Sequence, residues 1–185
     1  MSRRVLIHDP PDHFLAGSTG KGPTRAFYLQ AISGEEIHSV RLSGEQLRLL
    51  AERMNEVLED TRTSDEMSGI PADTTSEELR GPTLRQPVDI EFVVGALGLG
   101  WNEYTKRLVV EAHALTEPIT AVPEIESESG AGPDTLRVRL TGTQARVFCE
   151  HTRGLMQSRA TECPFCHNPL DPGGHVCPRA NGYRR

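Results

Sequence analysis

The chain has 185 residues, of which 36% are hydrophobic and 25% are charged, and its formal net charge is −6. This length fits one domain or two small halves that share a core, and the negative balance excludes a surface that coats nucleic acid generally. No stretch approaches the roughly 18 consecutive apolar residues of a membrane span, and Pro10 and Pro11 interrupt any export signal. We therefore expect a cytoplasmic protein without membrane contact.

The first 60 residues are predicted to form strands followed by a helix. A short apolar run at 5–8, the segment 13–16 and the alternating segments 25–32 and 35–42 indicate strands, with Ser33-Gly34 as the turn of a hairpin. Ser43 and Gln46 have the spacing of a capping box, so a helix begins there. Its apolar residues recur at helical spacing and predict one buried face: Leu47, Leu50, Ala51, Met54, Val57 and Leu58.

Residues 61–87 are rich in small polar and acidic residues without periodicity, which predicts a flexible linker. Strands are expected again over 88–99, with a bulge or a close backbone approach at its glycines, over 107–115 and over 134–140. A second capping box at Thr141 and Gln144 starts a second helix, which we expect to run to about Ser158. Between the last two strands, 117–134 holds five acidic and no basic residues, so we expect a solvated loop.

Two parts of the chain resemble each other. Residues 40–46 (VRLSGEQ) match 138–144 (VRLTGTQ) at an offset of 138 − 40 = 98. The apolar face of the first helix then falls on apolar residues of the second, except that Met54 falls on Thr152. Upstream, 25–31 resembles 106–112 at offset 81, and 14–17 resembles 92–95 at offset 78.

This similarity predicts an α+β fold made of two βββα repeats, 1–60 and 88–159, related by a pseudo-two-fold axis. The sheet should be mainly antiparallel, with the two helices on one side. Two separately packed halves on a tether are one alternative, and chance similarity between two capping boxes, which are a common motif, is another. In this alignment Cys149 takes the position of Ala51, which indicates a buried thiol and not a nucleophile.

The segment 160–185 has the spacing of a zinc knuckle. Cys163 and Cys166 form one ligand pair, and His175 and Cys177 form a second. Three thiolates and one imidazole complete a tetrahedral Zn²⁺ shell, so we expect a structural site without an open position. His167 in place of His175, or Asp171, gives an alternative ligand set. Without an export signal, metal-bound thiols are favoured over disulfides.

The end of the chain is basic and carries one aromatic residue, and it could contact RNA, single-stranded DNA, a protein partner or the acidic loop. The residues concerned are Arg179, Tyr183, Arg184 and Arg185. The favoured function is a zinc-stabilised binding or adaptor module with a protein partner, and nucleic-acid binding through this tail is an alternative.

An enzyme with a site between the repeats is a further alternative. Its candidate residues lie on or beside predicted strands: His8, Asp12, His13, Glu111 and His113. Glu111 and His113 share a strand face, because side chains two apart point the same way. The favoured interpretation of both is a pair of surface polar residues on a half-exposed strand.

The run CPFC…PLDP…GHVCPRANGYRR, together with FLAG and RAFYLQA near the start, resembles the domain-of-unknown-function 3090 family. The similarity extends over nearly the whole chain, apart from the expected linker and the acidic loop. It implies a bacterial protein without an established activity, with the family's ligand pattern at Cys163, Cys166, His175 and Cys177. The family has glycine where this chain has His167, which implies that His167 is not a ligand, although it could compete for the metal.

Overall fold

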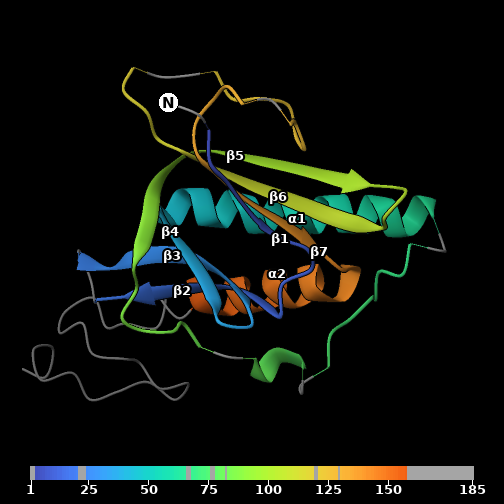
Figure 1. The fold of residues 1–185 in the computed structure, drawn as a ribbon. Coiled ribbons are helices and arrows are strands. Elements are labelled where there is room, and N and C mark those ends of the chain that lie inside the picture. Colours follow the sequence, from blue (N-terminus) through green and yellow to red (C-terminus); the bar gives the residue numbers. More distant parts are fainter. Residues whose placement is uncertain are drawn as a thin grey trace, which may run out of the picture.

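The structure is a computed structural model that describes residues 3–20, 24–65, 68–75, 78–81, 83–118, 121–128 and 130–157. Within these residues, seven strands form one sheet in the order β1-β7-β6-β5-β4-β3-β2 (Figure 1). The elements are β1 (Val5–His8), β2 (His13–Thr19), β3 (Ala26–Ser33), β4 (Glu36–Leu42), α1 (Gly44–Ser64), the 3-10 helix η2 (Glu78–Arg80), β5 (Ile90–Asn102), β6 (Arg107–Ala114), β7 (Thr135–Leu140) and α2 (Gly142–Gln157).

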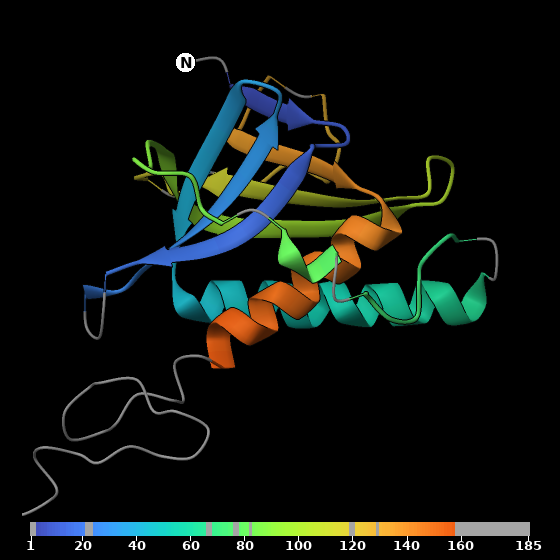
Figure 2. The ribbon, with the colours of Figure 1, turned by 90° about the horizontal axis from the view of Figure 1, so that it is seen from below.

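The sheet is mixed and mostly antiparallel. β2, β3 and β4 form one antiparallel meander, and β5, β6 and β7 form another. The two meanders meet where β4 pairs with β5 in parallel, and β1 pairs in parallel with β7 at the other edge. Figure 2 shows both long helices against one face of this sheet. The α+β class, the mainly antiparallel sheet and the helices on one side are confirmed.

The core lies between the helices and the inner face of the sheet. Strand alternation supplies one layer, with Leu29 and Val110 at 1% exposure, and the predicted face of α1 supplies the other, with Leu47 and Met54 at 0%. Cys149 of α2 also belongs to this core, and its burial raises the pKa of its thiol to about 12. A buried, protonated thiol confirms the structural interpretation of Cys149.

The irregularity predicted for the glycine-rich strand is present in β5. The register with β6 shifts between Val94 and Ala96, which marks a bulge. At Gly95, a Cβ atom would lie 2.8 Å from the Cα of Leu115, so the two backbones approach too closely for a larger residue. Both expectations for this strand, a bulge and a close backbone approach, are therefore confirmed.

Both capping boxes are present. In α1 the Gln46 amide donates to Ser43 Oγ at 3.0 Å and Gln46 Oε1 accepts from the Ser43 amide at 2.9 Å. In α2 the matching distances between Thr141 and Gln144 are 3.1 and 3.0 Å. The side-chain amide of Gln144 also donates to the Pro11 carbonyl at 2.7 Å, which ties the start of α2 to the segment before β2.

We expect Ser43→Ala and Thr141→Ala each to lower the free energy of unfolding by about 1 kcal/mol, because each leaves a helix-start amide without its acceptor. Urea denaturation would measure both. Thr63→Ala is the matched control, since the exposed Thr63 hydroxyl donates to the Glu59 carbonyl within α1 and caps nothing. Losses at Ser43 and Thr141 no larger than that at Thr63 would contradict a capping role.

The described parts of the predicted linker are attached to the core. Its first residues belong to α1, which continues to Ser64, and Ile70 is 8% exposed within the core cluster. Further on, the Arg85 amide donates to Gln30 Oε1 at 2.9 Å, and Gln30 Nε2 donates to the Arg85 carbonyl at 3.3 Å. This segment therefore contacts both the helical layer and the outer face of β3.

The acidic loop between β6 and β7 also folds against the sheet, on the face away from the helices (Figure 2). Ile125 lies over Gly98 and Gly100 of β5, where no side chain fills the space. Glu126 accepts hydrogen bonds from Arg139 Nε at 2.6 Å and from Asn102 at 2.9 Å. Most described residues of this loop are exposed, as expected, but the loop is not loose: Arg139 of β7 and Asn102 of β5 fix the Glu126 carboxylate against the sheet.

Candidate functional site

The predicted metal ligands and tail contacts lie outside the described residues, which end at Gln157 of α2. This applies to Cys163, Cys166, His175 and Cys177, to the alternatives His167 and Asp171, and to Arg179, Tyr183, Arg184 and Arg185. The described residues contain no group of three or more His, Cys, Asp or Glu side chains arranged to hold a metal ion.

The five enzyme candidates lie in three separate places. Asp12 and His13 line a cavity between β2 and α2. His8 contacts Ser33 and His38. Glu111 and His113 lie beneath the acidic loop on the outer face of the sheet. A single site that uses all five residues is therefore absent from the described structure.

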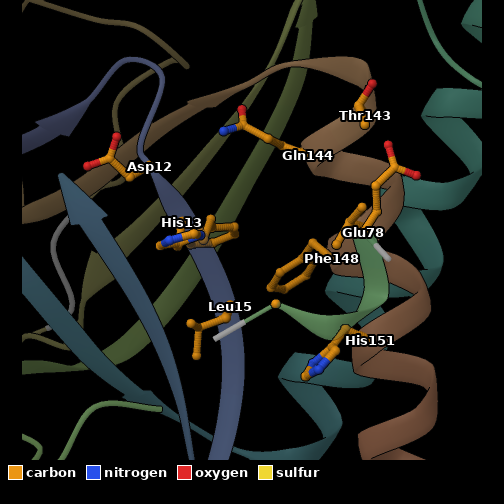
Figure 3. A pocket seen from close by; sticks show the side chains of 11 residues that line it. Asp12, His13, Leu15, Glu78, Thr143, Gln144, Phe148 and His151 are labelled. Carbon is orange, nitrogen blue, oxygen red and sulfur yellow. The ribbon is translucent and has the colours of Figure 1, made fainter. Parts of the chain in front are cut away.

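The β2–α2 cavity has a volume of about 270 Å³ and an apolar floor (Figure 3). Phe14 of β2 stacks on Phe148 of α2 with 4.8 Å between ring centroids, and Leu15 and Val147 extend the apolar surface. The floor exists because β2 is an edge strand of the sheet, and its inner face packs directly on α2. A cavity with this lining can bury an apolar or aromatic group.

The rim of the β2–α2 cavity is polar and carries two carboxylates. Glu78 accepts hydrogen bonds from the Thr75 amide at 2.7 Å and the Thr75 hydroxyl at 2.9 Å, which lower the pKa of its carboxyl. Asp12 Oδ2 accepts from the Gly34 amide at 2.7 Å. At the other end, the Nδ1 atom of His151 is buried without a hydrogen-bond partner among the described residues. The rim thus combines fixed negative charge with an unused imidazole nitrogen.

Glu111 and His113 are not surface residues, and the expectation that they are is wrong. Their exposed fractions are 0% and 1%, because the acidic loop covers this part of the sheet. Glu111 Oε1 accepts from Arg137 Nε at 2.5 Å and from the Glu126 amide at 2.9 Å. Its Oε2 lies 3.3 Å from His113 Nε2 and 4.0 Å from Arg3 Nη2. This buried charge cluster attaches the loop and the N-terminal segment to the sheet.

His8 is brought next to two residues that the sequence did not single out. Its Nδ1 lies 2.6 Å from Ser33 Oγ, and its Nε2 lies 2.9 Å from His38 Nδ1. His8 itself is 1% exposed, whereas Ser33 and His38 are half-buried. No local pattern predicts the contact, because the partners are 25 and 30 residues from His8 along the chain.

The profile of a family described as a protein of unknown function, DUF3090, matches residues 7–177. The chain belongs to the DUF3090 family. The matched segment of this DUF3090 protein contains both meanders and both helices, and it ends at Cys177, the last of the predicted metal ligands. No curated protein and no solved structure matches the chain. Neither α1 nor α2 has the length and apolar character that crossing a bilayer requires.

In this DUF3090 protein, stability should fall as the pH drops through the histidine range. Burial lowers the pKa of His113, reinforced by Arg3 and Arg137 and opposed by Glu111. Burial likewise lowers the pKa of His8, reinforced by His38 and opposed by Glu36. Below pH 6.5 the unfolded chain binds protons that the folded chain does not, so the free energy of unfolding decreases with falling pH.

The free energy of unfolding should change by at most about 1.4 kcal/mol per pH unit for each of the two histidines, His8 and His113. Urea denaturation at pH 7.5, 6.5 and 5.5 would measure it. His113→Gln should flatten the dependence, while the exposed His13→Gln variant should follow the wild-type curve. A stability that is constant from pH 7.5 to 5.5 would contradict this expectation.

Proposed function

We propose that this DUF3090 protein is a zinc-stabilised binding module whose β2–α2 cavity receives an apolar or aromatic side chain of a protein partner. The observation that carries the proposal is that α2 both lines the cavity and immediately precedes the segment with the predicted metal ligands. This helix supplies Val147, Phe148 and His151 to the cavity, and its last residue, Gln157, leads into the segment that contains the predicted ligands. An apolar floor with a few polar groups at the rim is typical of ligand sites.

Zinc enters the proposal through the chemistry of its donor set. Cys163, Cys166, His175 and Cys177 offer three thiolates and one imidazole, which fits a closed tetrahedral shell. A bound Zn²⁺ would supply folding free energy to residues 160–185, about 10–16 kcal/mol in comparable small zinc units.

The charge of the rim favours one class of ligand. The carboxylates of Asp12 and Glu78 are exposed beside the apolar floor, so they attract an ammonium or guanidinium group and repel a phosphate. The nucleic-acid alternative therefore rests on Arg179, Tyr183, Arg184 and Arg185 alone. The enzyme alternative that used the five candidates together loses its support, because they do not share one cavity.

The proposal includes a duplicated βββα scaffold with a pseudo-two-fold axis, over 1–60 and 88–159. The β3–β4 ladder pairs Leu29 with Val40, and the β6–β7 ladder pairs Val110 with Val138. The differences, 110 − 29 = 81 and 138 − 40 = 98, are the offsets at which the two sequence segments resemble each other. Agreement between sequence offset and strand register supports the duplication.

The strands β2 and β5 align at a different offset from the one that the sequence similarity gave. Gly17 pairs with Tyr28 in the β2–β3 ladder, and Gly100 pairs with Val109 in the β5–β6 ladder. The offset between the glycines is 100 − 17 = 83, so the sequence alignment of 14–17 with 92–95, at offset 78, is wrong in register. With the corrected offset, β1 and the start of β5 take the same place in each half, parallel to β7 and to β4.

The cavity can be tested with two small probes of opposite charge. Phenethylamine should shift the NMR resonances of His151 and Val147, and phenylacetate should shift them less, because of the carboxylates at the rim. Val147→Trp should abolish the effect by filling the cavity. Leu49→Trp, on α1 at a site 43% exposed, is the matched control and should leave it unchanged. If the His151 and Val147 resonances do not shift at millimolar phenethylamine, the cavity is not the binding site that we propose.

The zinc part has its own readout. Elemental analysis of the purified protein should find one zinc per chain, and Cys163→Ser combined with Cys166→Ser should lose it. Thr63→Ser, on the surface of α1, should retain it. A wild-type protein purified without chelator that holds no stoichiometric metal would remove zinc from the proposal.

A further inference from the structure

Ser33, His8 and His38 form a hydrogen-bonded chain that takes no part in the β2–α2 cavity. Ser33 ends β3, His8 ends β1, and His38 lies on β4. The distances along the chain are 2.6 Å from Ser33 Oγ to His8 Nδ1 and 2.9 Å from His8 Nε2 to His38 Nδ1. A hydroxyl, an imidazole within hydrogen-bond reach, and a third group that orients the imidazole are the components of an activated serine.

The hydrogen bonds are consistent with that role in one tautomer. When His8 carries its proton on Nε2, it donates to His38 Nδ1 and its Nδ1 lone pair accepts the Ser33 hydroxyl proton. Burial and the neighbouring His38 lower the pKa of His8, so its imidazole is neutral at neutral pH and able to accept that proton. His8 is 1% exposed, so in the resting state the Ser33 hydroxyl is the partner of this nitrogen; a water molecule reaches it only after the leaving group has departed.

The turn that follows Ser33 is held in place by Asp12, which does not belong to the Ser33–His8–His38 hydrogen-bonded group. Gly34 has a φ of +59°, which glycine adopts without strain, and its amide donates to Asp12 Oδ2 at 2.7 Å. Ser33 and His38 are half-buried, so each residue keeps some contact with solvent. Ser33 is thus held in place without being fully buried.

We propose that Ser33 is an acyl-accepting nucleophile, with His8 as its general base and His38 as the residue that positions His8, and that it acts on small carboxylic esters and thioesters. None of the three residues lines the β2–α2 cavity, so this cavity cannot hold a large acyl group next to Ser33. We therefore expect small acyl donors. This activity is independent of the proposed binding function and could fail without affecting it.

The reaction balances without a further reagent. Ser33 Oγ forms a bond to the acyl carbon while its proton passes to His8 Nδ1, and the bond from that carbon to the leaving alkoxide or thiolate breaks. His8 then gives the proton to the leaving group. A water molecule, deprotonated by His8, attacks the acyl-serine, the bond to Ser33 Oγ breaks, and the proton returns to Ser33.

The test uses the full-length protein and 4-nitrophenyl acetate at pH 7.5. Release of 4-nitrophenolate should exceed the buffer rate, and peptide mass spectrometry should find an acetyl group on Ser33 at short times. Ser33→Ala should reduce the rate to background. Ser18→Ala is the matched control, because the Ser18 hydroxyl contacts Arg25 Nε at 3.0 Å, and it should keep the wild-type rate.

His38 is tested by a pair of substitutions, because a positioning residue acts through another group. His38→Asn keeps an acceptor near the place of Nδ1 and should retain most of the rate. His38→Leu removes the acceptor and should lower the rate by about 100-fold, the lower bound for a general base that is no longer oriented. Thermal unfolding of each variant checks that the fold persists. A wild-type rate equal to buffer, acetylation of Ser18 and Ser33 to equal extents, or equal rates for the two His38 variants would overturn the proposal.

Discussion

Replacing Glu111 by leucine should lower the free energy of unfolding by about 3–5 kcal/mol, the usual loss when one partner of a buried ion pair is removed. Arg137, 2% exposed, would remain buried without the carboxylate that its Nε contacts at 2.5 Å. The Glu126 amide would lose its acceptor in the same step, so the acidic loop would loosen as well. Urea denaturation measures the loss, and amide exchange of residues 124–128 reports the loop.

A surface ion pair provides the comparison for Glu111. Arg53 and Glu56 lie 2.7 Å apart on α1 with both side chains exposed, so Glu56→Gln should change stability by less than about 1 kcal/mol. Combining Glu111→Leu with Arg137→Met should recover part of the loss, because an apolar pair of similar volume replaces both charges. If Glu111→Leu alone costs no more than Glu56→Gln, the buried charge cluster does not stabilise the fold.

Phe148→Ala should cost about 3–5 kcal/mol, since it removes a ring that is 1% exposed at the centre of the core. The same ring stacks on Phe14 and forms the floor of the β2–α2 cavity, so the variant should also lose phenethylamine binding. Denaturation and NMR titration measure the two effects separately.

Two further measurements test how Phe148 contributes to stability. Val147→Ala removes a smaller, half-buried side chain of the same cavity and should cost clearly less stability than Phe148→Ala. A Phe14→Leu, Phe148→Leu double-mutant cycle should give a coupling of about 0.5–1.5 kcal/mol for the stacked pair. A coupling of zero would show that the rings contribute only through the area they bury.

The local elements of this protein follow from local sequence. Short apolar runs and alternating segments predict the strands, and the two capping boxes predict the starts of both helices to within one residue. The apolar spacing after Ser43 predicts which side of α1 is buried, and Leu47, Leu50, Met54 and Leu58 are the buried ones. These predictions succeed because backbone hydrogen bonding and side-chain direction depend on neighbours within four residues.

The outer face of the sheet is where the sequence pattern misleads. Polar residues on a strand normally indicate solvent, yet Gln30 is 1% exposed and Glu111 is fully buried. Each contacts a segment that crosses over the sheet: Gln30 bonds the backbone of Arg85, and Glu111 bonds the backbone of Glu126. A polar side chain at these positions satisfies backbone groups of the covering segment, which an apolar one could not do.

By itself, the sequence determined the elements, the buried side of α1, the buried thiol of Cys149 and membership of the DUF3090 family, because each depends on residues close together or on a pattern shared along the chain. Only the tertiary structure decided that His8 meets Ser33 and His38, that Glu111 pairs with Arg137, and that β2 and α2 enclose a cavity. These contacts join segments that are distant in the sequence. They depend on the curvature of the sheet and on which loops cover it, and no local sequence pattern encodes either.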